Sequence, residues 1–390
     1  MMNCTGSTLH TKQGITALIL SGGGARAAYQ VGVLQAIAQW LRQPEQNPFP
    51  VILGTSAGAI NALGLACNAQ HFSQGVSKLT EVWQQLASQQ IYRTDWLGVL
   101  SQATSFIWQH LLGRGDQHCG MALLDNRPLM DFLQQQLDLS QLDPALTSKA
   151  LLAVGVTAFA YGAGQSVTFY QSQQISKSWQ RHRRIGTPQS LTYQHLMAST
   201  AIPLFFAPVA LAGDHYGDGA LRQVAPISPA LHLGANRVLV IGVGNPEELS
   251  DQLAKPPSLA QVAGQLLNST FTDNLENDLE SLLRVNQFAQ LFSSSKVAQQ
   301  QAPGWELAAQ PVDVCVISPS QNLDAIALQY RRHLPAALRP FLSGTGASQA
   351  GGGGILSYLL FEAEYCRQLM ALGYADAQAQ QQTIKAFLYC

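Results

Sequence analysis

Ser56 lies between two glycines, Gly54 and Gly58, in the sequence GTSAG, which has the G-x-S-x-G spacing of a nucleophile turn. A short apolar run at residues 49–53 precedes it, and an apolar helical pattern at 59–66 follows. Glycines permit a sharp strand-to-helix turn that holds the hydroxyl at a helix N-terminus, where backbone N–H groups and the helix dipole stabilise developing negative charge. The pattern favours a nucleophilic serine over an ordinary turn of small residues.

A second glycine-rich turn, Gly22-Gly23-Gly24, follows the apolar run at residues 15–20 and opens another helical pattern. Successive glycine N–H groups can surround an oxyanion, which is the stabilisation that acyl transfer needs. The same residues with Ala27 also satisfy the dinucleotide pattern G-x-G-x-x-A. That pattern requires an acidic residue at the end of a second strand about twenty residues on, and Glu45 does not end an apolar strand. The oxyanion interpretation is therefore favoured.

A nucleophilic serine needs a base to accept its proton. In a conventional α/β-hydrolase the base is a histidine that follows the acid in the chain, so His232 and His333, after Asp218, are the nominal candidates. In that fold, however, several strands precede the nucleophile, whereas here one strand and one helix precede Ser56. The order of elements argues against a conventional triad.

These turns must be held by a larger framework. The order strand, glycine turn, helix occurs twice near the N-terminus, which predicts an α/β fold with a mainly parallel central sheet flanked by helices. Further strand-like runs lie at 151–157, 167–170, 206–211, 237–242 and 312–317, and helical patterns at 76–89, 125–137, 258–292, 323–342 and 355–372. We expect a catalytic domain over 14–245 and a mostly helical region over 246–390, whose run at 312–318 could add a strand to the sheet.

Composition excludes several classes of protein. Only 12% of the 390 residues are charged and the net charge is −1, so no general field attracts nucleic acid or an anionic membrane. The six cysteines have neither the spacing of a zinc site nor that of a disulfide framework, which favours a reducing compartment. The first residues contain no apolar stretch of signal-peptide length. We therefore expect a cytoplasmic protein without a nucleic-acid partner.

Two further segments allow alternative interpretations. Residues 96–112 are apolar and aromatic-rich, which favours core packing but also fits a lid or an acyl-chain surface that contacts a membrane. A basic cluster at 177–184 has the composition of a solvated loop, with a phosphate headgroup contact as the less favoured alternative. Peripheral membrane contact therefore stays open.

The chain resembles the patatin-like phospholipases. The resemblance rests on four segments in the order found in that family: SGGGARAAYQVGVL at 21–34, GTSAGAINAL at 54–63, MASTAIPLFFAPV at 197–209 and GDGALRQVAPISPAL at 217–231. With VTAFAYGAGQSVTFY at 156–170, it covers roughly the first 245 residues. It implies the family's α/β fold.

The resemblance also implies a two-residue catalytic site. The family's nucleophile falls on Ser56 and its acidic partner on Asp218, next to Gly219, which allows the backbone to pass close to the serine turn. Its oxyanion hole falls on Gly22, Gly23 and Gly24, with the basic residue Arg26. No metal or organic cofactor is implied.

One departure from the family concerns the segment after Asp218. Gln223 and Ala225 stand where many members carry an asparagine-rich stretch, which leaves that wall of the site undefined.

Together these features predict a serine-dependent lipid acyl ester hydrolase of the phospholipase A or lysophospholipase type, with an acyl lipid or phospholipid as substrate. Two alternatives use the same residues. An acyltransferase would pass the acyl group from the same acyl-enzyme to an alcohol, and a non-catalytic lipid- or nucleotide-binding protein would use only the glycine turns.

Overall fold

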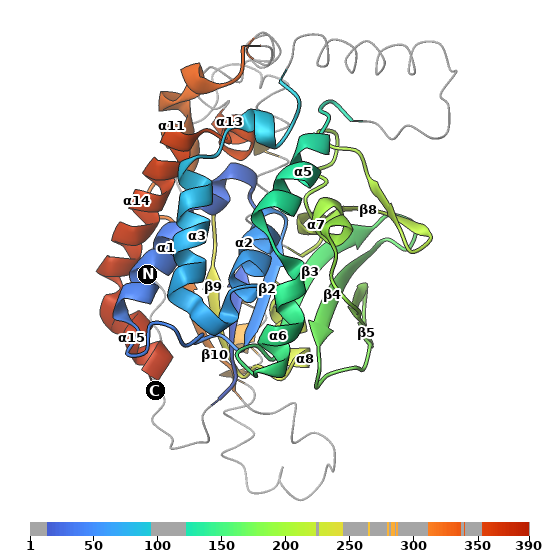
Figure 1. The fold of residues 1–390 in the computed structure, drawn as a ribbon, viewed down its shortest axis with the longest axis vertical. Coiled ribbons are helices and arrows are strands. Elements are labelled where there is room, and N and C mark those ends of the chain that lie inside the picture. The colour runs from blue at the N-terminus through green and yellow to red at the C-terminus, as the bar shows by residue number, and fades with distance from the viewer. Residues whose placement is uncertain are drawn as a thin grey trace, which may run out of the picture.

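The computed structural model of the protein describes residues 14–94, 122–223, 226–244, 311–336 and 353–389, with a few isolated positions between 264 and 287 and Arg339. Its strands form one ten-stranded sheet within these ranges. Helices cover the sheet, so the expected α/β class is confirmed (Figure 1).

The sheet is mixed rather than purely parallel. The order along it is β10-β9-β1-β2-β3-β4-β6-β5, with β8 also paired to β3 and β7 to β8. The run from β10 to β3 is parallel, whereas β4 and β8 pair with β3 in the antiparallel direction. The strands are β1 Thr16–Leu20, β2 Val51–Thr55, β3 Ala153–Ala160, β4 Gln165–Ser172, β5 Trp179–Arg181, β6 Arg184–Pro188, β7 Val209–Leu211, β8 Asp214–Asp218, β9 Arg237–Ile241 and β10 Asp313–Ile317.

Helices cover most of the predicted helical patterns at 76–89, 125–137 and 355–372 and the start of that at 323–342, whereas the pattern at 258–292 lies largely outside the described residues. The α-helices of the described ranges are α1 Ala28–Trp40, α2 Ala57–Ala66, α3 Phe72–Gln84, α5 Arg127–Gln136, α6 Leu142–Thr147, α7 Tyr193–Ser199, α8 Ile227–His232, α11 Leu323–Gln329, α13 Gly353–Leu359, α14 Ala363–Ala379 and α15 Gln381–Tyr389.

The central strands are buried on both faces, as their continuous apolar sequences require. In β1, Leu18 and Leu20 belong to the larger core cluster with α1 and α2, whereas Ala17 and Ile19 belong to a second cluster with α8. Figure 1 shows α1, α2, α3, α5 and α14 together on one face of the sheet. Alternation along the strand therefore divides the core into two layers.

The described strands and helices after residue 245 pack directly on the first part of the chain. Strand β10 lies parallel to β9, with Cys315 opposite Leu239. Helix α14 packs against α1 so closely that a Cβ on Gly32 would lie 1.9 Å from the Met370 carbonyl oxygen. The described C-terminal elements thus extend the same sheet and cover the same helical layer.

The sequence pattern missed strand β8, which carries Asp218. Its sequence, DHYGD, lacks the alternation of apolar residues that predicts a strand. Pairing with β3, where Asp218 lies opposite Ala158, holds it in the sheet. The apolar segment at 96–112 lies outside the described residues.

Candidate active site

Ser56 occupies the sharp turn between β2 and α2. Its backbone has φ 55° and ψ −133°, a left-handed conformation that costs a non-glycine residue roughly 1–3 kcal/mol. A Cβ on Gly54 would lie 2.4 Å from the Gly58 carbonyl oxygen, and one on Gly58 would lie 2.3 Å from that of Leu20. Both glycines are therefore required for the tight approach of β2, α2 and the end of β1.

Asp218 lies within hydrogen-bond distance of the serine hydroxyl. Ser56 Oγ donates to Asp218 Oδ2 at 2.5 Å, and both residues are buried. Three neighbouring strands create this contact, because Thr55 of β2 pairs with Thr157 of β3, and Ala158 of β3 pairs with Asp218 of β8. The geometry thus brings together two residues that are 162 positions apart in the chain.

The surroundings of Asp218 suit a group that accepts a proton. Burial raises the pKa of its carboxyl from 3.8 to about 7, while hydrogen bonds from Ser56 Oγ and the Ala220 backbone N–H oppose that rise. A Cβ on Gly219 would lie 2.3 Å from the Thr157 carbonyl oxygen, so the turn after Asp218 requires glycine. A base with a pKa near neutral is half-deprotonated at working pH and gains a proton readily.

Ser199 supports the serine turn from the end of α7. Its Oγ accepts a hydrogen bond from the Ser56 backbone N–H at 2.8 Å and donates one to the Thr157 carbonyl oxygen at 2.6 Å. The sequence interpretation assigned no role to this serine, although it lies in the MASTAIP segment that carries part of the family resemblance. Ser199 therefore ties the turn to the neighbouring strand.

The glycine loop and the serine turn border one pocket. Gly24 and Ser56 both line it, and Gly24 has φ +55° with its Cβ position 2.2 Å from the Tyr358 carbonyl oxygen. Of the residues that the structure describes, none accepts a hydrogen bond from the N–H groups of Gly22 or Gly23. These N–H groups are candidates for binding an oxyanion near Ser56.

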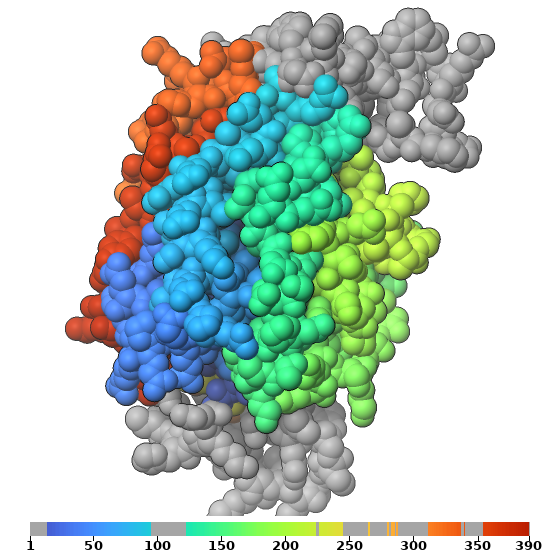
Figure 2. All heavy atoms as spheres, in the orientation of Figure 1, coloured from blue at the N-terminus to red at the C-terminus, as the bar shows by residue number. Residues whose placement is uncertain are grey.

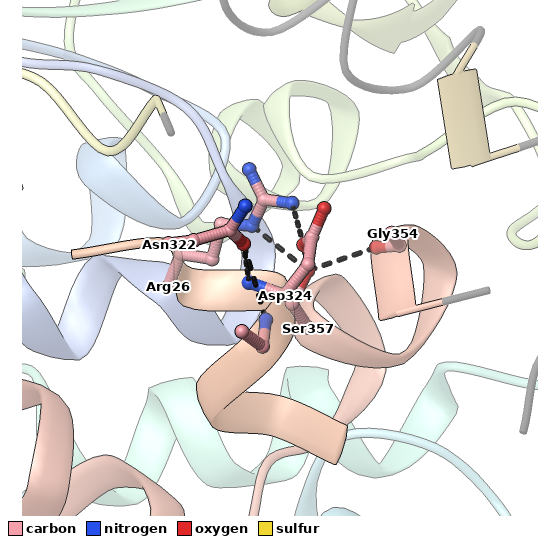
Figure 3. A network of polar contacts seen from close by, with 6 residues as sticks. Arg26, Asn322, Asp324, Gly354 and Ser357 are labelled. Carbon is pink, nitrogen blue, oxygen red and sulfur yellow. Dashed lines mark hydrogen bonds and ion pairs between the residues drawn. The ribbon is translucent and has the colours of Figure 1, made fainter. Parts of the chain in front are cut away.

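Arg26, the basic residue after the glycines, is fully buried among residues of the C-terminal region (Figure 3). Its guanidinium donates to Asp324 Oδ1 at 2.5 Å and to Ser357 Oγ at 2.9 Å, and it lies 3.9 Å from the centre of the Tyr358 ring. Ser357 in turn donates to Asp324 Oδ1. These contacts assign Arg26 a supporting position beneath the loop, which its sequence motif alone did not indicate.

The histidines considered for a conventional triad contact other groups. The His232 ring stacks on Trp179 with 5.0 Å between ring centres, and His333 Nε2 lies 3.2 Å from Glu364 Oε2. Within the part of the chain that the structure describes, no histidine hydrogen-bonds to Ser56 Oγ or to Asp218. The acid rather than a histidine is thus the neighbour of the serine hydroxyl.

Gln223 forms part of the wall beside the serine turn. Its Oε1 accepts a hydrogen bond from Ser166 Oγ at 3.1 Å, and its backbone carbonyl accepts one from Thr55 Oγ1 at 3.2 Å. Ala225, the other departure from the family pattern, lies outside the described residues. A glutamine therefore connects β2 and β4 here.

The described ranges contain neither a cluster of metal ligands nor a membrane-spanning helix. No three histidine, cysteine, aspartate or glutamate side chains there cluster as metal ligands would. No described helix combines the length and the apolar character needed to cross a bilayer.

Comparison with known proteins identifies several relatives of this chain. The family model described as patatin-like phospholipase matches residues 18–231, more than half of the chain. The chain is 27% identical over 229 residues to uncharacterized protein YjjU of Escherichia coli (strain K12), covering 58% of this chain and 52% of that protein. It is 23% identical over 221 residues to mouse calcium-independent phospholipase A2-gamma, covering 56% of this chain and 26% of that protein. The chain thus spans about half the length of one relative and a quarter of the other.

Solved structures to which the chain is similar include human GIVD cytosolic phospholipase A2, at a TM-score of 0.45 and 11% identity, covering 96% of this chain and 60% of that one. VipD from Legionella pneumophila has a TM-score of 0.39 and 12% identity, covering 95% of this chain and 67% of that one. The family assignment rests on the matched residues 18–231, which contain both glycine turns, Ser56 and Asp218. The chain belongs to the patatin-like phospholipase family.

Proposed function

We propose that the protein is a serine-dependent acyl ester hydrolase acting on lipids, with Ser56 as nucleophile and Asp218 as general base. The observation that carries the proposal is the 2.5 Å hydrogen bond from Ser56 Oγ to Asp218 Oδ2 in a buried turn. Membership of the patatin-like phospholipase family supports the same chemistry.

Acylation begins when Ser56 Oγ attacks the ester carbonyl carbon and Asp218 takes the hydroxyl proton. The raised pKa of Asp218, about 7, matches this task because the carboxylate is present near neutral pH and is basic enough to hold the proton. The proton then passes to the departing alkoxide, which leaves as an alcohol. An acyl-enzyme on Ser56 remains, and water activated by Asp218 hydrolyses it to a free carboxylic acid.

The glycine loop stabilises the charge that develops on the carbonyl oxygen. The N–H groups of Gly22, Gly23 and Gly24 are the proposed donors, and Gly24 borders the same pocket as Ser56. Such donors stabilise the tetrahedral intermediate more than the ground state, so they increase kcat. Arg26 acts in this proposal as a positioning residue for the loop, because its side chain contacts Asp324 and Ser357.

An apolar substrate suits the pocket beside Ser56. Most of its lining is aliphatic or aromatic, including Ile60, Leu133 and Phe206. A fatty acyl group buries apolar surface at such a site, whereas a small polar ester gains little. This favours lipid esters as the substrate class.

Labelling with a fluorophosphonate tests the nucleophile directly. The wild-type protein is expected to form one covalent adduct, located on Ser56 by peptide mass spectrometry, and to lose esterase activity in parallel. Ser56→Ala is expected to take up no label while keeping its thermal transition, because one oxygen is removed. A Ser77→Ala protein serves as a control for serine specificity, because Ser77 is exposed on α3 and does not line the pocket, and this variant should keep the adduct on Ser56.

The acceptor of the acyl group is tested in the same preparation. Hydrolysis predicts that free fatty acid accumulates from phosphatidylcholine vesicles whether or not a lysolipid is added. Diversion of most acyl groups to the lysolipid would instead identify an acyltransferase with the same acyl-enzyme. Absence of both the adduct and any product would refute the proposed enzymatic function.

A further inference from the structure

An apolar groove starts at Ser56 and continues between α2, α3 and α5. Ile60 and Gly64 of α2 lie along it, with Leu79 of α3 on one side and Leu133 of α5 on the other. In Figure 2, α3 in light blue and α5 in green lie side by side on this face. We call this feature the α2 groove.

The length of the groove follows from the positions of its lining residues along α2. Ser56, Ile60, Gly64 and Asn68 all line it and are spaced by four residues, so they follow one face of the helix and its C-terminal extension. At a rise of about 1.5 Å per residue, Gly64 is about 12 Å from Ser56 and Asn68 about 18 Å. The groove therefore runs along the helix from the nucleophile toward Asn68.

These lengths correspond to acyl chains of ordinary size. Carbon–carbon bonds of about 1.52 Å at angles of about 111° advance an extended chain by about 1.25 Å per carbon. An acyl group attached at Ser56 would thus pass Gly64 after about 10 carbons and reach Asn68 after about 14 carbons.

Gly64 allows Leu79 of α3 to pack closely against α2 at the middle of the groove. A Cβ at this position would lie 2.7 Å from Leu79 Cδ2 and 3.6 Å from Leu137 Cδ2, so its direction is toward the other two helices. Glycine weakens a helix interior relative to alanine, and here it makes the close contact with Leu79 possible. A larger side chain at position 64 would displace Leu79, which also lines the groove, and so narrow the space for an acyl chain.

The groove becomes polar at its far end. Lys78 Nζ donates to Asn68 Oδ1 at 2.7 Å, and Lys78 and Gln136 are both exposed there. A terminal methyl group gains little by contact with an ammonium group that is hydrated. The apolar part of the groove therefore has a defined end.

We propose that the α2 groove binds the acyl chain of the substrate, and that Gly64 and Lys78 determine which chain length is preferred. The preferred acyl group is about 14 carbons long, counted from the scissile carbonyl. The inference rests on the proposed function, since it places the acyl chain of that reaction.

The test uses p-nitrophenyl esters of increasing chain length with the full-length protein. The measured quantity is the ratio of kcat/KM for the tetradecanoyl ester to that for the butanoyl ester, taken within each variant. For the wild-type protein, kcat/KM is expected to increase with length up to about 14 carbons and to decrease beyond. Gly64→Leu should lower the ratio at least tenfold, and Gly64→Ala should lower it less.

Lys78→Met tests the same groove by extending its apolar part, which should increase the preferred chain length. Lys78 is exposed, so the substitution does not depend on refolding of the core. Replacing the ammonium group with an apolar side chain should move the preferred length up by about two carbons or more. Ser77→Leu is the matched control, because Ser77 is exposed on α3 and does not line the groove. Its ratio should equal that of the wild type.

Failure of the groove assignment is separable from failure of the proposed function. A folded Gly64→Leu protein with the wild-type ratio, or one that loses all chain lengths equally, would overturn the groove assignment. If the wild-type protein hydrolyses neither ester, the proposed function fails, and the groove is tested without turnover. Calorimetric affinity of the Ser56→Ala protein for tetradecanoate should then fall at least tenfold on adding Gly64→Leu, and equal affinities would overturn the assignment.

Discussion

The serine turn and the glycine loop follow neighbouring strands of one sheet, yet different parts of the chain hold them. The serine turn contacts Leu20, Ser199 and Asp218, all of which lie within residues 18–231 that match the family model. The glycine loop is packed instead against the C-terminal region, through the Tyr358 carbonyl oxygen and the contacts of Arg26.

Substitutions in the two regions are therefore expected to impair the same site in different ways. Substitutions near the serine turn remove reacting groups. Substitutions in α11 or α13 act at a distance, because Asp324 and Ser357 hold Arg26 and thereby the loop. The proposed catalytic unit therefore includes described elements of the C-terminal region, although the family model ends at residue 231.

The largest expected effect follows from replacing the base. Asp218→Asn should lower kcat for ester hydrolysis by about 10³- to 10⁴-fold, because an amide cannot accept the serine proton. Steady-state kinetics on a short ester measure kcat, and the thermal transition shows whether the variant is folded. A folded Asp218→Asn protein within tenfold of the wild-type rate would exclude Asp218 as the base.

A smaller loss of kcat is expected from a substitution that acts through the glycine loop. Asp324→Asn should lower kcat about ten- to a hundredfold with little change in KM, because a displaced loop weakens stabilisation of the transition state. The variant should also unfold at a lower temperature, since it removes the charge of Asp324 beside the buried Arg26 guanidinium.

Asp376→Asn is the matched control for Asp324→Asn. Asp376 is also a buried acid of the C-terminal region, but it accepts hydrogen bonds from Tyr29 and Ser320 and does not contact Arg26. It should lower the thermal transition with kcat within about threefold of wild type. Equal loss of kcat in both variants would show that the region contributes stability only.

The pH dependence of kcat/KM tests the proposed role of Asp218 beside the serine turn. With the pKa of Asp218 raised to about 7, the carboxylate form of the free enzyme is lost as pH falls through that value. The prediction is that kcat/KM decreases about tenfold per pH unit below about pH 6.5. A profile that stays level down to about pH 5 would contradict an Asp base with this environment.

The same raised pKa predicts that the base destabilises the fold. The folded state holds its proton up to about pH 7, whereas the unfolded carboxyl loses it near 3.8, so stability falls as pH rises between these values. Asp218→Asn removes this cost, which is roughly 2–4 kcal/mol above pH 7. Thermal unfolding should therefore show the variant more stable than wild type at pH 8, with a smaller difference at pH 5.

The smallest effect is expected at the histidines. His232 stacks on Trp179 and His333 lies beside Glu364, so neither can take the proton of Ser56. His232→Ala and His333→Ala should each keep kcat/KM within about threefold of wild type. A histidine variant as inactive as Ser56→Ala would restore the conventional triad.

Much of the site could be predicted from local sequence. Gly54, Ser56 and Gly58 form their turn from neighbouring residues, and the backbone there has the conformation that the spacing requires. Strand β8 could not be predicted, because its polar sequence has no strand pattern and only pairing with β3 holds it. Asp218 is therefore identified from the family resemblance, and only the folded structure shows its hydrogen bond to Ser56.

The sequence by itself determined the α/β class, the two glycine turns and the residue type at each, since apolar periodicity and glycine act over a few neighbouring positions. Only the tertiary structure decided that Arg26 contacts Asp324, 298 positions away, and that three helices leave a groove beside Ser56. The physical reason is that the burial and pairing of a charge depend on which distant elements come into contact. Local sequence patterns do not predict these contacts.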